Sequence, residues 1–495
     1  MKGCNFNNLG FLSPYHFVDD AGFKTFDKFD ELVSARQSEE IDPVSILEYL
    51  NRRYFLADRT LLRNVRKSAW MTSVNDELPR RLAALPDHGG LETGPELIAA
   101  GLTARLRQEL LDACSGTRRI LLPLSGGMDS RVIAAVLWDL KRTGELSADI
   151  DTITWGVDTS RDVIYGQQLA TLLKWNWQHL RLTPDVLANN LDVVVGLGCE
   201  FAGLHLHAKT ALRNLRGYDL VLVASFGDSV GRAMYSGLHV SRLDSLLKVG
   251  NPFSLLRQGV YSRILAAAMD DARYYHSLFP RTEAWQANEI DQQAHYMYRM
   301  LNPAWAYVNE RIPVYQCFGA PSVFGYMWSF SPVSRNDIPY YHLIHTINKE
   351  LLMVPWAKTG GSYPHGPQTD NYLSLLAPYG QWTREDLAEM IAEHLFDGVL
   401  DSMGIFNMRN IKTIFTYMKK GSFVASTHVS EILLWLTSLS KAVRAYSLTV
   451  DQQYTRYTFK DLYSELISTP VYSARLFYGP NLKLAYQNLV GNLRH

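Results

Sequence analysis

The 495-residue sequence is poor in cysteine, carries no net charge and contains no long apolar run. Its four cysteines are far apart and form no Cys-x-x-Cys pair, which argues against a disulfide framework or a structural zinc site. The 49 basic residues balance 49 acidic ones, so no bulk electric field attracts nucleic acid or an anionic membrane. No uninterrupted apolar segment approaches about 18 residues, and the first residues lack an apolar stretch of signal length. We therefore expect a cytoplasmic protein without a membrane span.

The strongest local signal is a short loop between a strand and a helix. Residues 121–130 (LLPLSGGMDS) join an apolar run of strand length to a helix start through a Ser-Gly-Gly sequence. Glycines let the backbone approach a ligand closely, and the free N–H groups at a helix start attract anions. Ser125 and Ser130 add hydroxyl groups, and Asp129 adds a carboxylate of the kind that holds Mg²⁺ against a polyphosphate. The motif Gly-x-x-x-x-Gly-Lys-Ser/Thr is absent, so γ-phosphate transfer by a P-loop enzyme is not supported.

Strands and helices alternate on either side of this loop. A helical pattern at 93–113 precedes it, and apolar runs predict further strands at 150–155, 177–182 and 218–224 with helices between them. Such alternation implies a parallel sheet that binds its ligand at the carboxyl ends of the strands. The loop after the last of these strands, at 225–232, would open onto the same face. From about residue 240 the pattern is helical almost to the end of the chain.

The order of these motifs resembles a known family. The loop itself resembles the pyrophosphate loop of the N-type ATP pyrophosphatases. Together with a Ser-Arg-Asp helix start at 160–162 and a strand that closes on Gly227-Asp228, it resembles the asparagine synthetase family over about 95–365. The resemblance implies an α/β fold, with a parallel twisted sheet covered by helices on both faces and extended by a largely helical C-terminal region.

The same resemblance suggests how the chain is divided. Residues 54–60 are similar to the end of the family's N-terminal domain, and turn formers gather at 85–90. We expect residues 1–90 to be a reduced N-terminal region, a remnant of a glutaminase-like domain. Residues 91–495 would form the synthetase domain, with a nucleotide-binding core at 91–240 and a mainly helical part at 241–495.

The resemblance also assigns roles to individual residues. The family cleaves ATP between its α and β phosphates, joins AMP to a substrate oxygen and releases pyrophosphate. Asp129 and Asp228 correspond to its two Mg²⁺-coordinating carboxylates, which would stabilise the charge of the leaving group. Lys358 lies in a segment that resembles the one carrying the active-site lysine, which stabilises charge as an amine attacks the acyl-adenylate. The residues implied to bind ATP are Leu124, Ser125, Gly126, Gly127, Asp129, Ser130, Trp155, Gly156 and Gly227.

Two departures from the family bear on the reaction. Glutamine-dependent members have a cysteine directly after the initiator methionine, whereas this chain has Lys2, and only about 115 residues precede the first strand of the predicted sheet. We therefore expect no glutamine hydrolysis, with nitrogen supplied as an amine, as ammonia or by a partner protein. Asparagine synthetases also carry an acidic residue before the metal-binding aspartate, where this chain has Ser225 or Phe226. This difference puts asparagine as the product in doubt.

The leading hypothesis is an ATP-dependent ligase that forms an amide through an acyl-adenylate, in peptide or natural-product biosynthesis. Its substrates would be a small molecule or peptide that supplies a carboxylate and an amine. One alternative is another ATP pyrophosphatase, such as a tRNA-modifying enzyme, although tRNA binding needs a basic surface. Another is an inactive homologue that binds nucleotide without turnover. The pairs His205/His207 and His342/His345 have ligand-like spacing but no third ligand nearby, so we interpret them as structural.

Overall fold

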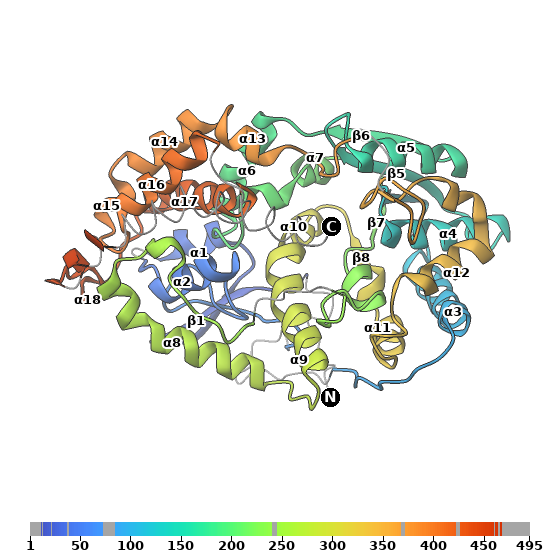
Figure 1. The fold of residues 1–495 in the computed structure, drawn as a ribbon, viewed down its shortest axis with the longest axis horizontal. Coiled ribbons are helices and arrows are strands. Elements are labelled where there is room, and N and C mark those ends of the chain that lie inside the picture. The colour runs from blue at the N-terminus through green and yellow to red at the C-terminus, as the bar shows by residue number, and fades with distance from the viewer. Residues whose placement is uncertain are drawn as a thin grey trace, which may run out of the picture.

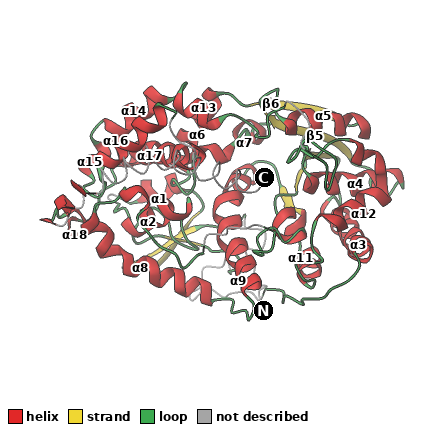
Figure 2. Cartoon of the chain, viewed as in Figure 1, coloured by secondary structure: helices red, strands yellow, loops and turns green. Residues whose placement is uncertain are grey.

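Helices dominate the chain, and its named strands form two sheets (Figure 2). The computed structural model describes residues 11, 13–20, 22–36, 39–72, 85–239, 245–367, 372–421, 426–459, 461–463 and 466–467. Lys2 and Cys4 lie outside the described residues. No helix in this described part of the chain is both long and apolar enough to cross a membrane.

The larger sheet has five parallel strands in the order β6-β5-β4-β7-β8. The strands predicted near 121, 150, 177 and 218 are confirmed. The fifth strand, β8, lies in the region expected to be helical, which corrects that expectation. Three residues are too few to show a strand periodicity, and β8 forms because it pairs with β7. The strands are β4 (Arg119–Pro123), β5 (Asp149–Gly156), β6 (Asn176–Arg181), β7 (Leu220–Val223) and β8 (Val314–Gln316).

Helices connect the strands of this sheet and cover both of its faces. Ile120 and Leu122 face a core that they share with the helices at 95–113, 128–142 and 161–173. Leu121 faces a smaller core with Leu212 and Val308. Successive side chains of a strand point to opposite faces, so both faces are buried, as expected for a parallel sheet. The helices are α3 (Pro95–Ala113), α4 (Met128–Arg142), α5 (Arg161–Leu173), α6 (Pro184–Gly196), α7 (Lys209–Arg213) and α10 (Asn302–Asn309).

The smaller sheet lies near the N-terminus and is antiparallel, in the order β2-β1-β3. Residues 46–50 (ILEYL) have a sequence typical of a short helix, and the helix in the structure is ten residues long. That helix begins at Asp42, whose carboxylate accepts from Val44 N–H, and Pro43 follows as the first helical residue. The elements are β1 (Tyr15–Asp19), β2 (Gly22–Phe26), α1 (Phe29–Ala35), α2 (Pro43–Arg52) and β3 (Arg66–Lys67).

The remainder of the described chain is helical, apart from β8. Its α-helices are α8 (Gln258–Ser277), α9 (Ala284–Asp291), α11 (Pro321–Trp328), α12 (Asp337–Asn348), α13 (Tyr379–Arg384), α14 (Ala388–Phe396), α15 (Val399–Ser402), α16 (Met408–Lys419), α17 (Ser426–Tyr446) and α18 (Gln452–Thr455). Shorter or wider helical segments are η1 (Gly203–Leu206), η2 (Gly227–Gly231), η3 (Pro252–Ser254), η4 (Gln292–Leu301), η5 (Cys317–Gly319) and η6 (Lys349–Met353).

The N-terminal elements share a hydrophobic core with the C-terminal helices. Figure 1 shows α1 and α2, in blue, among α8, α16 and α17. The Trp435 ring of α17 stacks on Tyr49 of α2 at 3.8 Å between ring centres. This core therefore joins the first 65 residues to residues beyond 376, whereas the second core surrounds β4, α3, α4 and α12. The expected division at about residue 90 stays a prediction.

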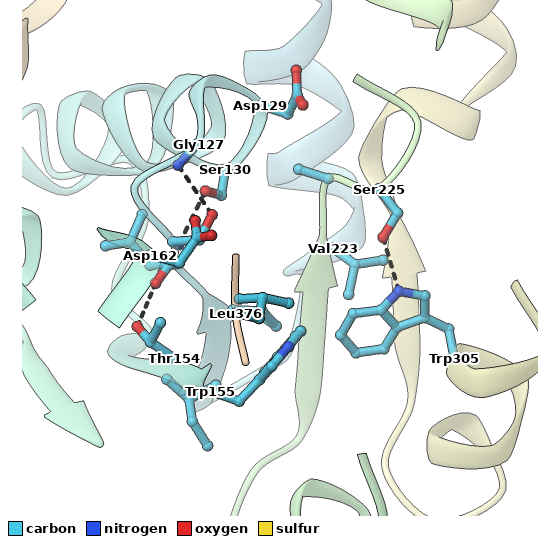
Figure 3. A pocket seen from close by; sticks show the side chains of 15 residues that line it. Gly127, Asp129, Ser130, Thr154, Trp155, Asp162, Val223, Ser225, Trp305 and Leu376 are labelled. Atoms are coloured by element: carbon cyan, nitrogen blue, oxygen red, sulfur yellow. Dashed lines mark hydrogen bonds between the residues drawn. The ribbon is translucent and has the colours of Figure 1, made fainter. Parts of the chain in front are cut away.

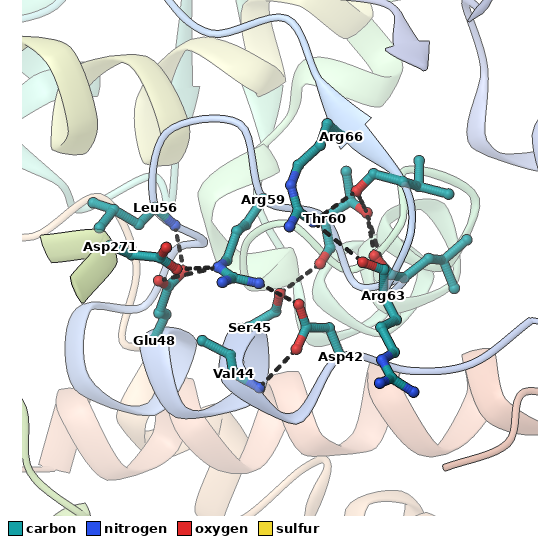
Figure 4. A network of polar contacts seen from close by, with 12 residues as sticks. Asp42, Val44, Ser45, Glu48, Leu56, Arg59, Thr60, Arg63, Arg66 and Asp271 are labelled. Atoms are coloured by element: carbon teal, nitrogen blue, oxygen red, sulfur yellow. Dashed lines mark hydrogen bonds and ion pairs between the residues drawn. The ribbon is translucent and has the colours of Figure 1, made fainter. Parts of the chain in front are cut away.

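A buried ionic network holds α2 to its surroundings (Figure 4). Arg59 forms ion pairs with Asp42 and with Asp271 of α8, and its Nε lies 3.6 Å from Glu48 Oε1. Glu48 is fully buried and accepts a hydrogen bond from Leu56 N–H. Arg59 belongs to residues 54–60, whose sequence resembles the end of the family's N-terminal domain. The network fixes this segment between α2 and α8.

Candidate active site

The Ser-Gly-Gly loop follows β4 and ends at the start of α4. Gly127 N–H donates to Ser125 Oγ at 3.1 Å, and Ser125 N–H donates to Ser130 Oγ at 3.3 Å. A Cβ atom on Gly126 would come within 2.8 Å of Ala357 Cβ and 2.9 Å of Tyr165 Cβ, so only glycine fits there. The sequence therefore folds into a tight turn at the helix N-terminus, which is a suitable site for an anion.

Asp162 supports this turn from the first residues of α5. Its carboxylate accepts hydrogen bonds from the Ser125 hydroxyl and from Gly126 N–H. Burial raises the pKa of Asp162, and the two hydrogen bonds oppose that rise because they favour the charged form. Ser160 caps α5 by accepting from Val163 N–H. The Ser-Arg-Asp helix start seen in the sequence thus braces the Ser-Gly-Gly loop.

A pocket opens at the carboxyl ends of β4, β5 and β7 (Figure 3). Its cavity volume is about 250 Å³, and it opens to solvent at its mouth. Asp129 lies at one end and Trp155 at the other, and Trp305 Nε1 donates to Ser225 Oγ at 2.8 Å along one wall. The lining residues are Pro123, Leu124, Ser125, Gly127, Asp129, Ser130, Ile153, Thr154, Trp155, Asp162, Val223, Ala224, Ser225, Trp305 and Leu376.

Most of the residues assigned to ATP line this pocket, and three glycines lie beside it. The residues in the lining are Leu124, Ser125, Gly127, Asp129, Ser130 and Trp155. Gly126 belongs to the loop but not to the pocket lining, and its carbonyl accepts from Ala357 N–H at 3.1 Å. The carbonyl of Gly156 accepts from Leu182 N–H at 3.0 Å, and that of Gly227 accepts from the Tyr340 hydroxyl at 2.9 Å. The roles of all these residues stay predictions.

The two aspartates assigned to Mg²⁺ lie next to each other. A Cβ atom on Gly227 would be 2.5 Å from Asp129 Cβ, so glycine permits the close approach of the β7 loop to α4. Burial, followed by repulsion from Asp129, raises the pKa of Asp228 to about 6. Two neighbouring carboxylates fit a divalent cation. No group of three or more His, Cys, Asp or Glu side chains suited to a metal occurs among the described residues, so phosphate oxygens and water would complete the coordination.

The segment that carries Lys358 is tied to the Ser-Gly-Gly loop. Arg131 is fully buried in α4, and its guanidinium donates to the carbonyls of Gly126, Leu351, Val354 and Pro355 at 2.7–3.1 Å. Lys358 itself is exposed and lies outside the pocket lining, with Nζ 5.0 Å from the centre of the Trp356 ring. The structure thus brings together two segments that are more than 200 residues apart in sequence.

Several pocket residues escaped sequence analysis. Asp162 belongs to a motif that was noted but given no role. Trp305 and Leu376 come from helical and loop segments without a recognisable motif. Arg232, which forms an ion pair with Asp129, follows the β7 loop by one turn and had no signal beyond its charge. These residues are brought to the site by tertiary contacts, which a local pattern does not encode.

The histidines of both pairs have protein partners, as expected of structural residues, and their role stays a prediction. His205 Nε2 lies 2.7 Å from Glu431 Oε1, and His207 Nδ1 lies 2.7 Å from the Tyr379 hydroxyl. His342 pairs with Glu96 at 3.3 Å, and the His345 ring stacks against Tyr341.

Fold and site together define an α/β protein with a ligand pocket at the carboxyl edge of a parallel sheet. Residues 102–305 match the sequence model of asparagine synthase, and this match supports membership of the asparagine synthetase family. This family is of the ATP-dependent ligase type and usually uses Mg²⁺ with ATP.

Comparison with whole proteins adds little to this assignment. No curated protein matches the chain. Among solved structures, the U34-tRNA thiolase NcsA from Methanococcus maripaludis with its 4Fe-4S cluster is similar at 13% identity. That alignment covers 46% of this chain and 84% of the thiolase, with a TM-score of 0.23. A likeness of this strength does not bear on substrate or mechanism.

Proposed function

We propose that this protein is an ATP-dependent ligase that activates a carboxylate as an acyl-adenylate and joins it to an amine. The observation that supports this most is the convergence of three distant segments at one edge of the sheet. The Ser-Gly-Gly loop, the β7 loop with Asp228 and the Lys358 segment meet there, through Gly227 against Asp129 and Ala357 against Gly126. An anion site, a pair of carboxylates and a lysine are the groups that such a reaction needs.

The polarity of the pocket suggests how ATP binds. The aromatic end around Trp155 and Trp305 suits the adenine ring, and the loop from Ser125 to Ser130 suits the phosphates. Asp129 and Asp228 would hold Mg²⁺, which supplies positive charge to the leaving pyrophosphate. Asp162 keeps the Ser125 hydroxyl and Gly126 N–H engaged, so the loop holds its shape for the phosphates.

The reaction then proceeds in two displacements. A carboxylate oxygen attacks the α-phosphorus, and the bond to pyrophosphate breaks. An amine nitrogen next attacks the acyl carbon, and AMP leaves with the bonding electron pair while the nitrogen loses a proton. Lys358, whose Nζ lies over the Trp356 ring, would stabilise the negative charge that develops in this second step.

The β7 loop bears on the class of acid that the site would accept. Ser225 or Phe226 stands where asparagine synthetases carry an acidic residue, and the Ser225 hydroxyl is already bonded to Trp305. We therefore propose a substrate other than aspartate, such as a peptide or a specialised metabolite. The amine would belong to the same molecule or to a second one, or would be ammonia delivered by a partner protein.

Nucleotide analysis tests this function. Incubation with ATP, Mg²⁺ and a panel of carboxylic acids and amines is expected to give AMP and pyrophosphate. Lys358→Ala is expected to lower amide formation at least about 100-fold, in line with the loss of one charge-stabilising group. Lys349→Ala, at an exposed lysine nine residues earlier, is the matched control and should retain activity. ADP as product, or unchanged turnover in Lys358→Ala, would overturn the proposal, and ATP binding without pyrophosphate release would favour an inactive homologue.

A further inference from the structure

A buried arginine occupies the place where magnesium would bind. Arg232 follows η2 and is 7% exposed. Its Nε lies 3.1 Å from Asp129 Oδ1, and its Nη2 lies 2.9 Å from Asp129 Oδ2. The guanidinium therefore engages both oxygens of a carboxylate that the resemblance assigns to the metal. A metal ion that uses either oxygen competes with Arg232.

The same guanidinium is also held from its other side. Arg232 Nη1 lies 3.1 Å from Asp337 Oδ1 at the start of α12. Tyr363 donates its hydroxyl to the Asp337 backbone carbonyl at 2.7 Å and approaches Asp337 Oδ1 at 3.1 Å, so this carboxylate is fixed. Asp337 can therefore retain Arg232 if the contact with Asp129 is lost.

Charge in this cluster is unbalanced without a further cation. Asp129, Asp228 and Asp337 bring three carboxylates, and Arg232 is the cation that pairs with two of them. Asp228 has no ion-pair partner among the described residues, and it adjoins Asp129. A divalent cation would satisfy Asp129 and Asp228 and would repel the guanidinium from Asp129.

A guanidinium released from Asp129 would lie close to the phosphates of a bound nucleotide. The Arg232 guanidinium lies next to Asp129, which belongs to the first turn of α4. The helix N-terminus and the Ser-Gly-Gly loop would hold the phosphates at this place. Arginine binds phosphate oxygens with two parallel donors, which suits it to the pyrophosphate group better than a point charge. The rings of Tyr340 and Trp356 lie against the guanidinium, but neither carries a negative charge that would neutralise it.

We propose that Arg232 is a positioning residue that exchanges Asp129 for the pyrophosphate group when metal and nucleotide bind, while Asp337 holds it in both states. This inference rests on the placement of ATP and Mg²⁺ in the proposed function. The exchange couples the two ligands, because metal frees the arginine for phosphate and phosphate draws the arginine away from the metal site. By linkage, each ligand then raises the affinity for the other by the same factor.

Binding without turnover tests the exchange. Mn²⁺ replaces Mg²⁺ so that free metal can be measured by electron paramagnetic resonance, and inorganic pyrophosphate replaces the nucleotide. Metal–pyrophosphate complexation in solution is subtracted in a titration without protein. In the wild type, saturating pyrophosphate is expected to tighten Mn²⁺ binding about tenfold or more. Arg232→Met is expected to bind Mn²⁺ alone about tenfold tighter than the wild type, to bind pyrophosphate more weakly, and to lose most of the coupling.

Two further variants complete the design. Arg232→Lys keeps the charge without the paired donors, so both binding constants are expected to fall between those of the wild type and Arg232→Met. It also provides the measurement if Arg232→Met does not fold. Arg181→Met is the matched control, since Arg181 lies at the same edge of the sheet and pairs with Asp158 instead.

The outcomes separate this inference from the proposed function. Mn²⁺ affinity that does not rise in the Arg232 variants, or coupling that equals the wild-type value, would overturn the exchange. No carboxylic acid is present in these titrations. The titrations therefore do not depend on adenylation. If the separate nucleotide analysis detects no adenylation, the proposed function is overturned and the binding result still holds.

Discussion

Asp162 contributes to the anion site by binding the loop that forms this site. Its carboxylate is hydrogen-bonded to the Ser125 hydroxyl and to Gly126 N–H, and these bonds hold the loop in place. An acidic residue beside a phosphate site looks unfavourable by charge alone, because like charges repel. Asp162 acts instead on the loop, where hydrogen bonds to a charged acceptor contribute about 1.5–3 kcal/mol each.

Replacing Asp162 by asparagine should weaken ATP binding. The amide oxygen still accepts one hydrogen bond but no longer carries charge, so the loop is held less firmly. We expect about a tenfold rise in the dissociation constant for ATP, which corresponds to about 1.4 kcal/mol, measured by isothermal titration calorimetry. Asp185→Asn changes an exposed acidic residue in the first turn of α6 and serves as the control. Equal affinity in Asp162→Asn and the wild type would contradict the role given to Asp162.

Residues of the site differ in how far the sequence could reveal them. Ser125, Gly127, Asp129 and Ser130 are contiguous, so strand, turn and helix signals coincide with their chemistry. Trp305 contacts Ser225 across 80 residues of sequence, and no spacing rule predicts that contact. The pocket was therefore predictable where it is made by one loop and not where distant helices close it.

At the scale of elements, the ionic network on α2 shows a helix fixed by charge as well as by packing. Arg59 is the shared cation of Asp42, Glu48 and Asp271, all of which are partly or fully removed from water. A buried carboxylate without a partner is costly, since neither water nor a cation balances its charge. The ionic part of the attachment of α2 to α8 thus depends on one side chain.

Arg59→Met should destabilise the protein strongly. Removal of the cation leaves Asp42 and Asp271 without a balancing charge, and such losses cost about 3–5 kcal/mol. Urea denaturation followed by circular dichroism measures the change in the free energy of unfolding. Arg63→Met is a close control, because Arg63 pairs with Glu40 and Asp451 on the surface, where an ion pair contributes about 0–1 kcal/mol. Similar losses in the two variants would show that the network is not what holds α2.

Glu48 makes the stability of this element depend on pH. Burial is the largest influence and raises its pKa from 4.5 to about 8, against the attraction of Arg59. Between these two values the folded protein keeps a proton that the unfolded chain has lost. The free energy of unfolding therefore falls as pH rises through this window, by up to about 1.4 kcal/mol per pH unit for one proton.

Glu48→Gln removes this titration. The slope of stability against pH between pH 5 and pH 8 is expected to be shallower than in the wild type, while the wild type is the more stable of the two only toward the acid end. Urea titrations at several pH values give the slopes. Identical slopes would show that Glu48 does not hold the proton.

At the scale of the whole molecule, the parallel sheet was predictable and the distribution of the cores was not. Each strand of β4, β5, β6 and β7 has its own apolar run, followed by a helix pattern, so local signals sufficed. The first core instead joins Tyr49 and Phe55 to Trp435, nearly 400 residues later. No periodicity tells which helix a residue meets at such a distance. The N-terminal sheet was missed for a related reason, because its strands are short and half exposed.

The shared core predicts that damage to α17 is felt in α2. Trp435 stacks on Tyr49 and donates Nε1–H to the Cys199 carbonyl at 2.7 Å, so Trp435→Ala leaves a cavity and an unpaired acceptor. Such a change costs about 3–5 kcal/mol, and regions that unfold as one unit lose protection together. Hydrogen–deuterium exchange with mass spectrometry is expected to show faster exchange in α2 as well as in α17, and unchanged exchange in α4. Trp328→Ala, in the second core, should produce the reverse pattern, with faster exchange in α3 and α11. If Trp435→Ala speeds exchange in α17 alone, the N-terminal elements fold independently of the C-terminal helices, which would support the division at residue 90.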